Sequence, residues 1–391
     1  MLNDRLRTGA LEVAGRCATP FYLFDLEELG AAYREMGRVW RREFPHLTVA
    51  YSYKTNPLAA VTRRLAELGG TAEVVSGAEL ELALADGFAP ERIVFDGPVK
   101  SPAELARAAR LGVLVHVDSL TELRQLLELP GGRPPVGLRL ATRGGGGEWS
   151  RFGLLPAEVE RARELLGRAG LPVRSVHVGV ATLSGPEAYR EALVSWAEVL
   201  RRLAKAAEGR LTVDVGGGFP PRGVPGRGWE VYAAAVAAGC REAGLGPEEV
   251  DLLIEPGRSL VEEHGALVCR VAVRKSRDGR ELLVLDGGTN LARTVKSRAH
   301  PIGFPAAPDD LGGRYRLLGA NCYEGDLFAD EVAGPADAAP GDLVVIGGSG
   351  GYDLPFAHIW VRPRPPVHAL DGGGNGGGGW TVVREPGDTV R

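Results

Sequence analysis

The stretch Leu47-Thr48-Val49-Ala50-Tyr51-Ser52-Tyr53-Lys54-Thr55-Asn56 decides how the chain is interpreted. Its first seven residues are largely β-branched or aromatic, a composition that predicts a buried strand. Pro57 follows, and because proline suits the first position of a helix, we expect a helix over residues 57–65. Lys54 therefore lies where a strand passes into a helix.

Lys54 is one of five lysines, and the other basic side chains are arginines. A desolvated lysine amine can form a Schiff base with an aldehyde, whereas an arginine keeps its charge and cannot act as an amine nucleophile. The alternative is that Lys54 has no catalytic role and that its aliphatic stem packs on apolar surface at the strand end while its amine reaches water.

Strand-like runs alternate with helical patterns from residue 47 onward. Eight strands separated by seven helical patterns predict parallel βαβ units, and this number favours a closed (β/α)8 TIM-like barrel over a doubly wound open sheet. The predicted strands cover residues 47–53, 71–76, 92–97, 113–118, 136–140, 173–178, 211–215 and 251–255.

Candidate binding and catalytic residues fall at the carboxyl ends of these strands, where barrels of this type carry their active sites. This placement also favours the barrel over the open sheet. The residues are Lys54, His177, Gly216, Gly217, Gly218 and Glu255.

Beyond about Val261 the pattern changes to strand-like segments separated by turns. We therefore expect an α/β barrel followed by an all-β domain, a β-barrel or sandwich that the N-terminal segment completes. A strand over 19–25 and a helix over 26–44 are expected before the barrel. The predicted boundaries are 1–27 for the N-terminal segment, 28–265 for the barrel and 266–391 for the β domain, and the glycine-rich run 371–379 is expected to be a flexible turn or tail.

Composition excludes several classes of function. A formal net charge of −4 argues against a surface for nucleic acid or anionic membrane. The sequence shows neither a signal peptide nor a run long enough to span a bilayer. The four cysteines are far apart and lack the spacing of a zinc or redox site, so we expect reduced thiols, a cytoplasmic protein and no metal.

The groups at the strand ends suit one cofactor. The glycine turn formed by Gly216, Gly217 and Gly218 can seat a phosphate, although a tight turn explains it equally well. Glu255 begins Glu255-Pro256-Gly257-Arg258, which offers a carboxylate and a guanidinium suited to an oxyanion. His177 is, taken alone, more typical of a satisfied strand-end residue. With the amine of Lys54, these groups describe a site for pyridoxal 5′-phosphate.

Nearly the whole chain resembles the fold-type III decarboxylases, the diaminopimelate and ornithine decarboxylase family. The resemblance implies that Lys54 forms the Schiff base, His177 stacks on the cofactor ring and Glu255 holds its pyridine nitrogen. The glycine turn, Gly257, Arg258 and Tyr352 would contact the phosphate. The segments that carry the resemblance are 51–56, 74–80, 151–153, 177–179, 214–218, 255–258, 321–326 and 350–352.

The resemblance also implies a homodimer with shared active sites. Cys322, in Asn321-Cys322-Tyr323-Glu324-Gly325-Asp326, would reach the active site of the partner subunit and protonate the carbanion left by decarboxylation. The alternative for Cys322 is a small buried hydrophobic residue. The residues expected to contact substrate are Arg293, Tyr323, Glu324 and Asp326.

Four departures from the family pattern concern phosphate and substrate contacts. Val180 replaces a frequent serine, and the segment 356–358 lacks the usual Phe-Asn. Tyr323 stands where diaminopimelate enzymes carry a glutamate, and Ser297 where a substrate-contacting tyrosine is expected. We therefore expect decarboxylation of an amino acid other than meso-diaminopimelate. The alternatives are an amino-acid racemase, against which Glu255 argues, and a non-catalytic cofactor-binding or regulatory homologue.

Overall fold

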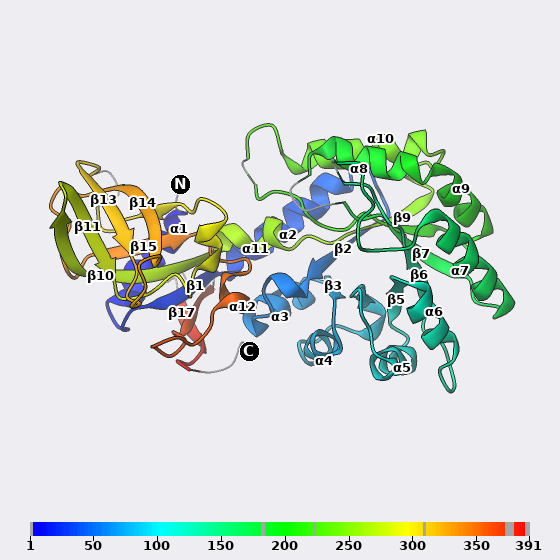
Figure 1. Cartoon of the computed structure of the whole chain (residues 1–391), viewed down its shortest axis with the longest axis horizontal. Coiled ribbons are helices and arrows are strands. Elements are labelled where there is room, and N and C mark those ends of the chain that lie inside the picture. Colours follow the sequence, from blue (N-terminus) through cyan, green and yellow to red (C-terminus); the bar gives the residue numbers. More distant parts are fainter. Residues whose placement is uncertain are drawn as a thin grey trace. The chain divides into compact units, whose positions relative to one another are not determined.

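The structure is a computed structural model that describes residues 3–144, 146–180, 184–222, 224–307, 310–371 and 379–387. The chain forms two compact units (Figure 1). The barrel unit comprises Ala32–Lys54 and Thr62–Ser259, and the β unit comprises Met1–Ala31, Thr55–Val61 and Leu260–Arg391. The domain boundaries expected from the sequence stay a prediction.

Eight parallel strands close the barrel, which confirms the barrel over the open sheet. Closure is made where Leu47 on the first strand pairs in register with Leu252 on the last. In chain order the strands are β2 (Leu47–Ser52), β3 (Thr71–Val74), β4 (Ile93–Phe95), β5 (Leu114–Val117), β6 (Val136–Arg139), β7 (Val173–His177), β8 (Leu211–Asp214) and β9 (Val250–Ile254).

Helices follow the strands of the barrel, as the alternating pattern predicts, and two of them follow β7. They are α3 (Ala59–Glu67), α4 (Gly77–Ala85), α5 (Pro102–Leu111), α6 (Leu120–Leu127), α7 (Pro156–Arg168), α8 (Pro186–Ser195), α9 (Ala197–Ala206) and α10 (Trp229–Glu242). α2 (Leu26–Trp40) comes before the barrel and ends earlier than expected, and α11 (Arg258–Val261) follows β9. Single 3-10 turns form at Tyr53–Thr55 and Pro90–Arg92.

The helix expected from Pro57 begins two residues later, at Ala59, and β2 ends at Ser52. Lys54 therefore lies on a 3-10 turn and not in the strand. Asn56 explains the delay, because its side chain accepts a hydrogen bond from Leu58 N and donates one to Gly350 O. A residue before proline also avoids helical backbone angles.

The β unit contains a mostly antiparallel sheet with the strand order β14-β13-β11-β10-β1-β16-β17, and β15 pairs with both β10 and β12. The N-terminal strand β1 lies inside this sheet, antiparallel to β10 and parallel to β16. The strands are β1 (Phe21–Asp25), β10 (Gly265–Arg277), β11 (Arg280–Leu285), β12 (Ile302–Gly303), β13 (Gly313–Leu318), β14 (Leu327–Gly334), β15 (Leu343–Gly347), β16 (Val367–Asp371) and β17 (Gly379–Arg384).

Short helical elements complete the β unit. The helix α1 (Asp4–Ala14) was not evident from sequence, and it buries Leu6, Ala10 and Val13 in one apolar core with side chains of β1, β10, β15 and β16. The others are η3 (Glu262–His264), η4 (Arg293–Lys296) and α12 (Asp353–Phe356). Most of the predicted glycine-rich turn, residues 372–378, lies outside the described residues.

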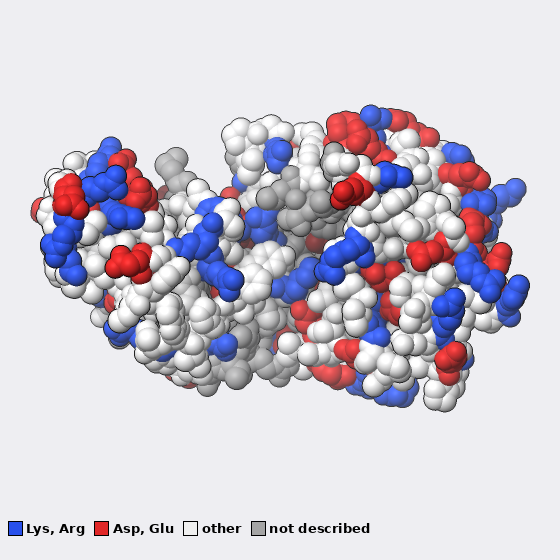
Figure 2. All heavy atoms as spheres, in the orientation of Figure 1, with Lys and Arg blue, Asp and Glu red and all other residues white. Residues whose placement is uncertain are grey.

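The surface carries both signs of charge. In Figure 2, blue and red side chains are interspersed over the helices of the barrel. Ion pairs between neighbouring helices include Arg107–Glu81 and Arg190–Glu242. Within the described part of the chain, no helix has both the length and the apolar character needed to cross a membrane.

Candidate active site

Ionisable side chains gather at the carboxyl end of the barrel. Each strand from β3 to β9 has at least one such residue in its last two positions or directly after its end, although barrel interiors are ordinarily filled by branched apolar side chains. In strand order these residues are Glu73, Asp96, His116, Arg139, His177, Asp214 and Glu255. All except Arg139 are buried, so their charges must be balanced within the site.

Lys54 forms an ion pair with Glu73. Its Nζ lies 2.7 Å from Oε2 and 3.0 Å from Oε1 of that carboxylate, which is fully buried, while 42% of the Lys54 side chain is exposed. Burial alone would lower the pKa of Lys54, but attraction to Glu73, Glu255 and Asp96 outweighs burial and raises it. The amine is therefore held as an ammonium group until a competing partner enters.

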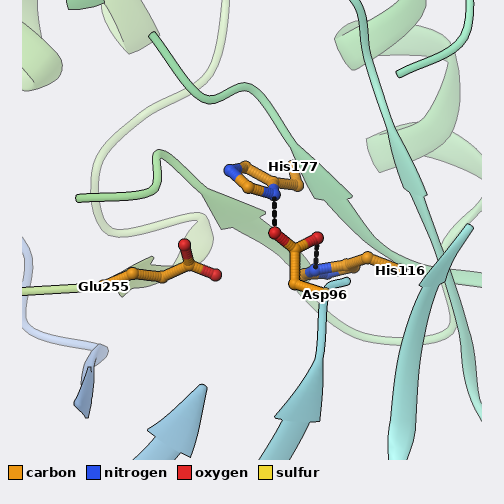
Figure 3. A group of neighbouring side chains, drawn as sticks. All are labelled: Asp96, His116, His177 and Glu255. Atoms are coloured by element: carbon orange, nitrogen blue, oxygen red, sulfur yellow. Dashed lines mark ion pairs between the residues drawn. The ribbon is translucent and has the colours of Figure 1, made fainter. Parts of the chain in front are cut away.

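Asp96 lies between two imidazoles (Figure 3). Its Oδ2 lies 2.9 Å from Nδ1 of His177, and its Oδ1 lies 3.2 Å from Nδ1 of His116. Ligand-type atoms of these three residues and of Glu255 all fall within 4.8 Å of one another. Because Asp96 already pairs with both histidines, we interpret the group as a network of ion pairs.

The glycine turn needs glycine at its first two positions. Gly216 has a φ of 69°, and its N–H donates a 2.8 Å hydrogen bond to Oδ1 of Asp214. A Cβ atom at Gly217 would lie 2.2 Å from the backbone oxygen of Glu255. A side chain at either position is therefore excluded by backbone conformation or by contact.

Glu255 is a buried carboxyl that forms no ion pair with a cationic side chain in the described part of the chain. No hydrogen-bond donor lies beside its Oε1 among the described residues. Burial, followed by repulsion from Asp214, Glu73 and Asp96, raises its pKa well above the ordinary value. A protonated ring nitrogen is the kind of group that would complete this position, because a buried carboxylate is stabilised by a directly bonded cation. Gly257 and Arg258 come two and three residues later, and Arg258 is the first residue of α11.

Several predicted site residues belong to the β unit. Cys322, Tyr323 and Glu324 are exposed, as is Arg293 on η4. Cys322 is exposed and its thiol is free, so the alternative of a small buried hydrophobic residue is wrong for this unit of the chain. Tyr323 is 57% exposed, and its ring centroid lies 6.0 Å from that of Trp360.

Two further residues of the β unit have structural partners. Asp326 is buried, and its carboxylate accepts hydrogen bonds from Thr289 N and Oγ1 and from Asn321 N. It therefore holds the loop that carries Cys322. Tyr352 is half-buried with a φ of 69°, in the left-handed region that side chains rarely occupy, and its ring stacks on Phe356.

Sequence reasoning missed five members of the barrel cluster as site residues: Glu73, Asp96, His116, Arg139 and Asp214. A signal was present, because each is an ionisable residue within or directly after an apolar strand, as in Ala72-Glu73-Val74 and Val115-His116-Val117. A charged residue inside a buried strand must have a partner, but the sequence does not show which one.

Comparisons with known proteins agree with this geometry. The family described as "Pyridoxal-dependent decarboxylase, pyridoxal binding domain" matches residues 31–262. The chain is 33% identical over 370 residues to a diaminopimelate decarboxylase of Deinococcus radiodurans, covering 90% of each chain. It is 30% identical over 280 residues to a chloroplastic ornithine decarboxylase of Nicotiana glutinosa, covering 68% of this chain and 62% of that protein.

A solved structure has the same fold. Diaminopimelate decarboxylase of Helicobacter pylori, complexed with L-lysine, superposes with a TM-score of 0.84 at 24% identity and covers 97% of both chains. The chain belongs to the fold-type III pyridoxal-phosphate-dependent decarboxylase family. It is an amino-acid decarboxylase whose cofactor is pyridoxal phosphate, which sets aside the racemase and the non-catalytic homologue.

Proposed function

We propose that Lys54 carries pyridoxal phosphate and that the substrate is an amino acid other than meso-diaminopimelate. When bound there, the cofactor would supply an electron sink for the loss of the carboxylate as carbon dioxide. The buried Oε1 of Glu255 has no hydrogen-bond donor beside it within the described ranges, which supports its assignment to the ring nitrogen. His177 would lie against one ring face. The glycine turn, Gly257, Arg258 and Tyr352 would hold the phosphate.

The residues of this chain have separate tasks in the reaction. The ion pair with Glu73 orients the Lys54 amine and keeps it protonated before cofactor attachment. Glu255 keeps a proton at the ring nitrogen, because a carboxylate in contact stabilises a cationic ring in a buried site. Cys322 carries an exposed thiol able to deliver a proton to the α-carbon.

Assembly into a homodimer would complete the site. Cys322, Tyr352 and Arg293 belong to the β unit, while Lys54 and His177 belong to the barrel unit. The family resemblance assigns the Cys322 loop to the active site of the partner subunit. The free cysteines among the described residues favour a reducing, cytoplasmic location.

The substrate proposal depends on the loop around Cys322. Tyr323 presents an exposed aromatic ring beside Trp360, at the position where diaminopimelate enzymes carry a glutamate. Ser297, also exposed, is too short to replace the expected tyrosine. A site that lacks the carboxylate for a distal ammonium group loses most of its discrimination for that group. The carboxylate of Asp326 is hydrogen-bonded within its loop, whereas Glu324 is exposed, so we propose Glu324 as the source of a replacement charge.

Steady-state kcat/KM over diaminopimelate, lysine, ornithine, arginine and acidic amino acids tests this proposal, with carbon dioxide release as the signal. We expect diaminopimelate not to be preferred, and we expect Tyr323→Glu to improve its relative kcat/KM while Tyr323→Phe does not. Diaminopimelate preferred by about a hundredfold, or about 2.7 kcal/mol of transition-state stabilisation, would refute the interpretation of Tyr323 and Ser297.

A further inference from the structure

Asp96 is the centre of a buried arrangement that the family resemblance did not assign. The residue is 3% exposed, and each of its carboxylate oxygens faces a different imidazole, that of His177 or that of His116 (Figure 3). The guanidinium of Arg139 lies 3.5 Å from Oδ2, on the side of β6. A carboxylate with three such neighbours is held in one orientation.

The structure makes room for this arrangement. A Cβ atom at Gly137 would lie 2.3 Å from Cδ2 of His116, so glycine on β6 allows the imidazole to enter the barrel. The Nε2 atom of His116 lies 2.8 Å from Oγ of Ser175. His116 therefore has a hydrogen-bond partner at Nε2 and lies at ion-pair distance from Asp96 at Nδ1, which limits the movement of Asp96 away from His177.

The Nε2 atom of His177 lies against the proposed cofactor seat. A Cβ atom built on Gly216 would be 3.0 Å from Nε2, and one built on Gly179 would be 2.5 Å from it. Nδ1 therefore faces Asp96, while Nε2 faces the glycine turn. A second proton on this ring would place positive charge beside the turn that is assigned to the phosphate.

Carboxyl groups dominate the surroundings of His177. The titratable and charged groups that face it are Asp96 from β4, His116 from β5, Arg139 from β6, Asp214 from β8 and Glu255 after β9. Burial lowers the pKa of His177 and Arg139 acts in the same direction, but Asp96 and Asp214 outweigh them and raise it. The pKa of Asp96 is lowered well below its ordinary value, chiefly because His177 and Arg139 overcome the effect of burial.

We propose that Asp96 is a positioning residue that holds His177 as an imidazolium, with Nδ1 on the carboxylate and the protonated Nε2 toward the glycine turn. His116 and Arg139 keep Asp96 in place. The consequence for cofactor binding rests on the proposed function, in which this turn seats the phosphate. The protonation state of His177 itself does not depend on that assignment.

The test uses the full-length enzyme with its cofactor, labelled with ¹⁵N in the histidine rings. An NMR titration of wild type, with a His177→Gln variant for assignment, should show His177 doubly protonated well above the ordinary histidine pKa of about 6.5. In Asp96→Asn, which keeps an acceptor but loses the charge, we expect this pKa to fall by at least about one unit. Asp118→Asn is the matched control, because Asp118 also lies 3.5 Å from Arg139 but makes no ion pair with His177.

A second measurement connects the charge to cofactor binding. The dissociation constant of pyridoxal phosphate should rise severalfold in Asp96→Asn at pH 7.5, and the difference should shrink as pH falls and the ring is protonated in both proteins. Asp96→Glu should restore part of the affinity, since it restores the charge. A purely structural role would instead weaken binding equally at every pH.

Three results would overturn the proposal. A neutral His177 at pH 7 in wild type would do so without any variant, even if Asp96→Asn fails to fold. An unchanged His177 pKa in Asp96→Asn, or an equal fall in Asp118→Asn, would also do so. Failure of the proposed function is recognised separately, because the cofactor would then stay covalently bound in Lys54→Ala whatever the charge of His177.

Discussion

Replacing Glu73 by glutamine should lower the pKa of Lys54 and speed its reaction with the cofactor. The substitution keeps the size of the side chain and one hydrogen-bond acceptor but removes the charge that lies 2.7 Å from the amine. Burial lowers the pKa of Lys54, and in the variant one fewer carboxylate opposes this effect.

The expected magnitude follows from the distance and the exposure. At 2.7 Å, two unit charges attract by about 1.5 kcal/mol in bulk water and by about 6 kcal/mol at an effective dielectric constant of about 20. Because 42% of the Lys54 side chain is exposed, solvent screening favours the lower figure, which corresponds to about one pKa unit. The amine of the variant would be the free base about ten times more often at a given pH below its pKa.

The pKa can be measured by NMR after ¹³C reductive methylation of the cofactor-free protein, since the chain has only five lysines to assign. The rate of covalent attachment of pyridoxal phosphate at pH 8 should rise by up to about tenfold in parallel. Glu81→Gln is the matched control, because Glu81 forms an ion pair of the same 2.7 Å length with Arg107 at the surface. An unchanged Lys54 pKa in Glu73→Gln, or an equal fall in the control, would refute the reasoning.

Three further outcomes are expected. Lys100→Met should lower the free energy of unfolding by about 3–5 kcal/mol in urea denaturation, because it leaves the buried carboxylate of Glu122 without its 2.7 Å partner. Adding Glu122→Gln should recover part of this loss. A loss below about 1 kcal/mol in Lys100→Met would argue against a stabilising ion pair. Burial raises the pKa of Glu79 from 4.5 to about 7. The folded state therefore binds this proton more tightly than the unfolded state, and wild-type stability should fall as pH rises through that range. In Glu79→Gln this part of the fall should be missing from a plot of Tm against pH, and an identical slope in both proteins would contradict the prediction. Mixing inactive Lys54→Ala and Cys322→Ala subunits should restore activity if the dimer shares its sites, and no recovery after confirmed subunit exchange would count against it.

The barrel was predictable from the sequence because its signal is local. Each strand is a short apolar run, each helix follows at a regular interval, and eight repeats favour closure. Lys54, His177 and Glu255 could be singled out for the same reason, since parallel strands bring their carboxyl ends to one rim. These groups together indicated the cofactor, and the resemblance of the motifs added the roles of single residues.

Tertiary structure decided which of these side chains meet. The pairing of Asp96 with His177 joins β4 to β7, and that of Lys54 with Glu73 depends on the register between β2 and β3. Register and closure are set by packing over the whole barrel, so no local pattern contains them. Burial then turns these contacts into pKa shifts, because charges removed from water must be balanced by whichever groups the fold brings within reach.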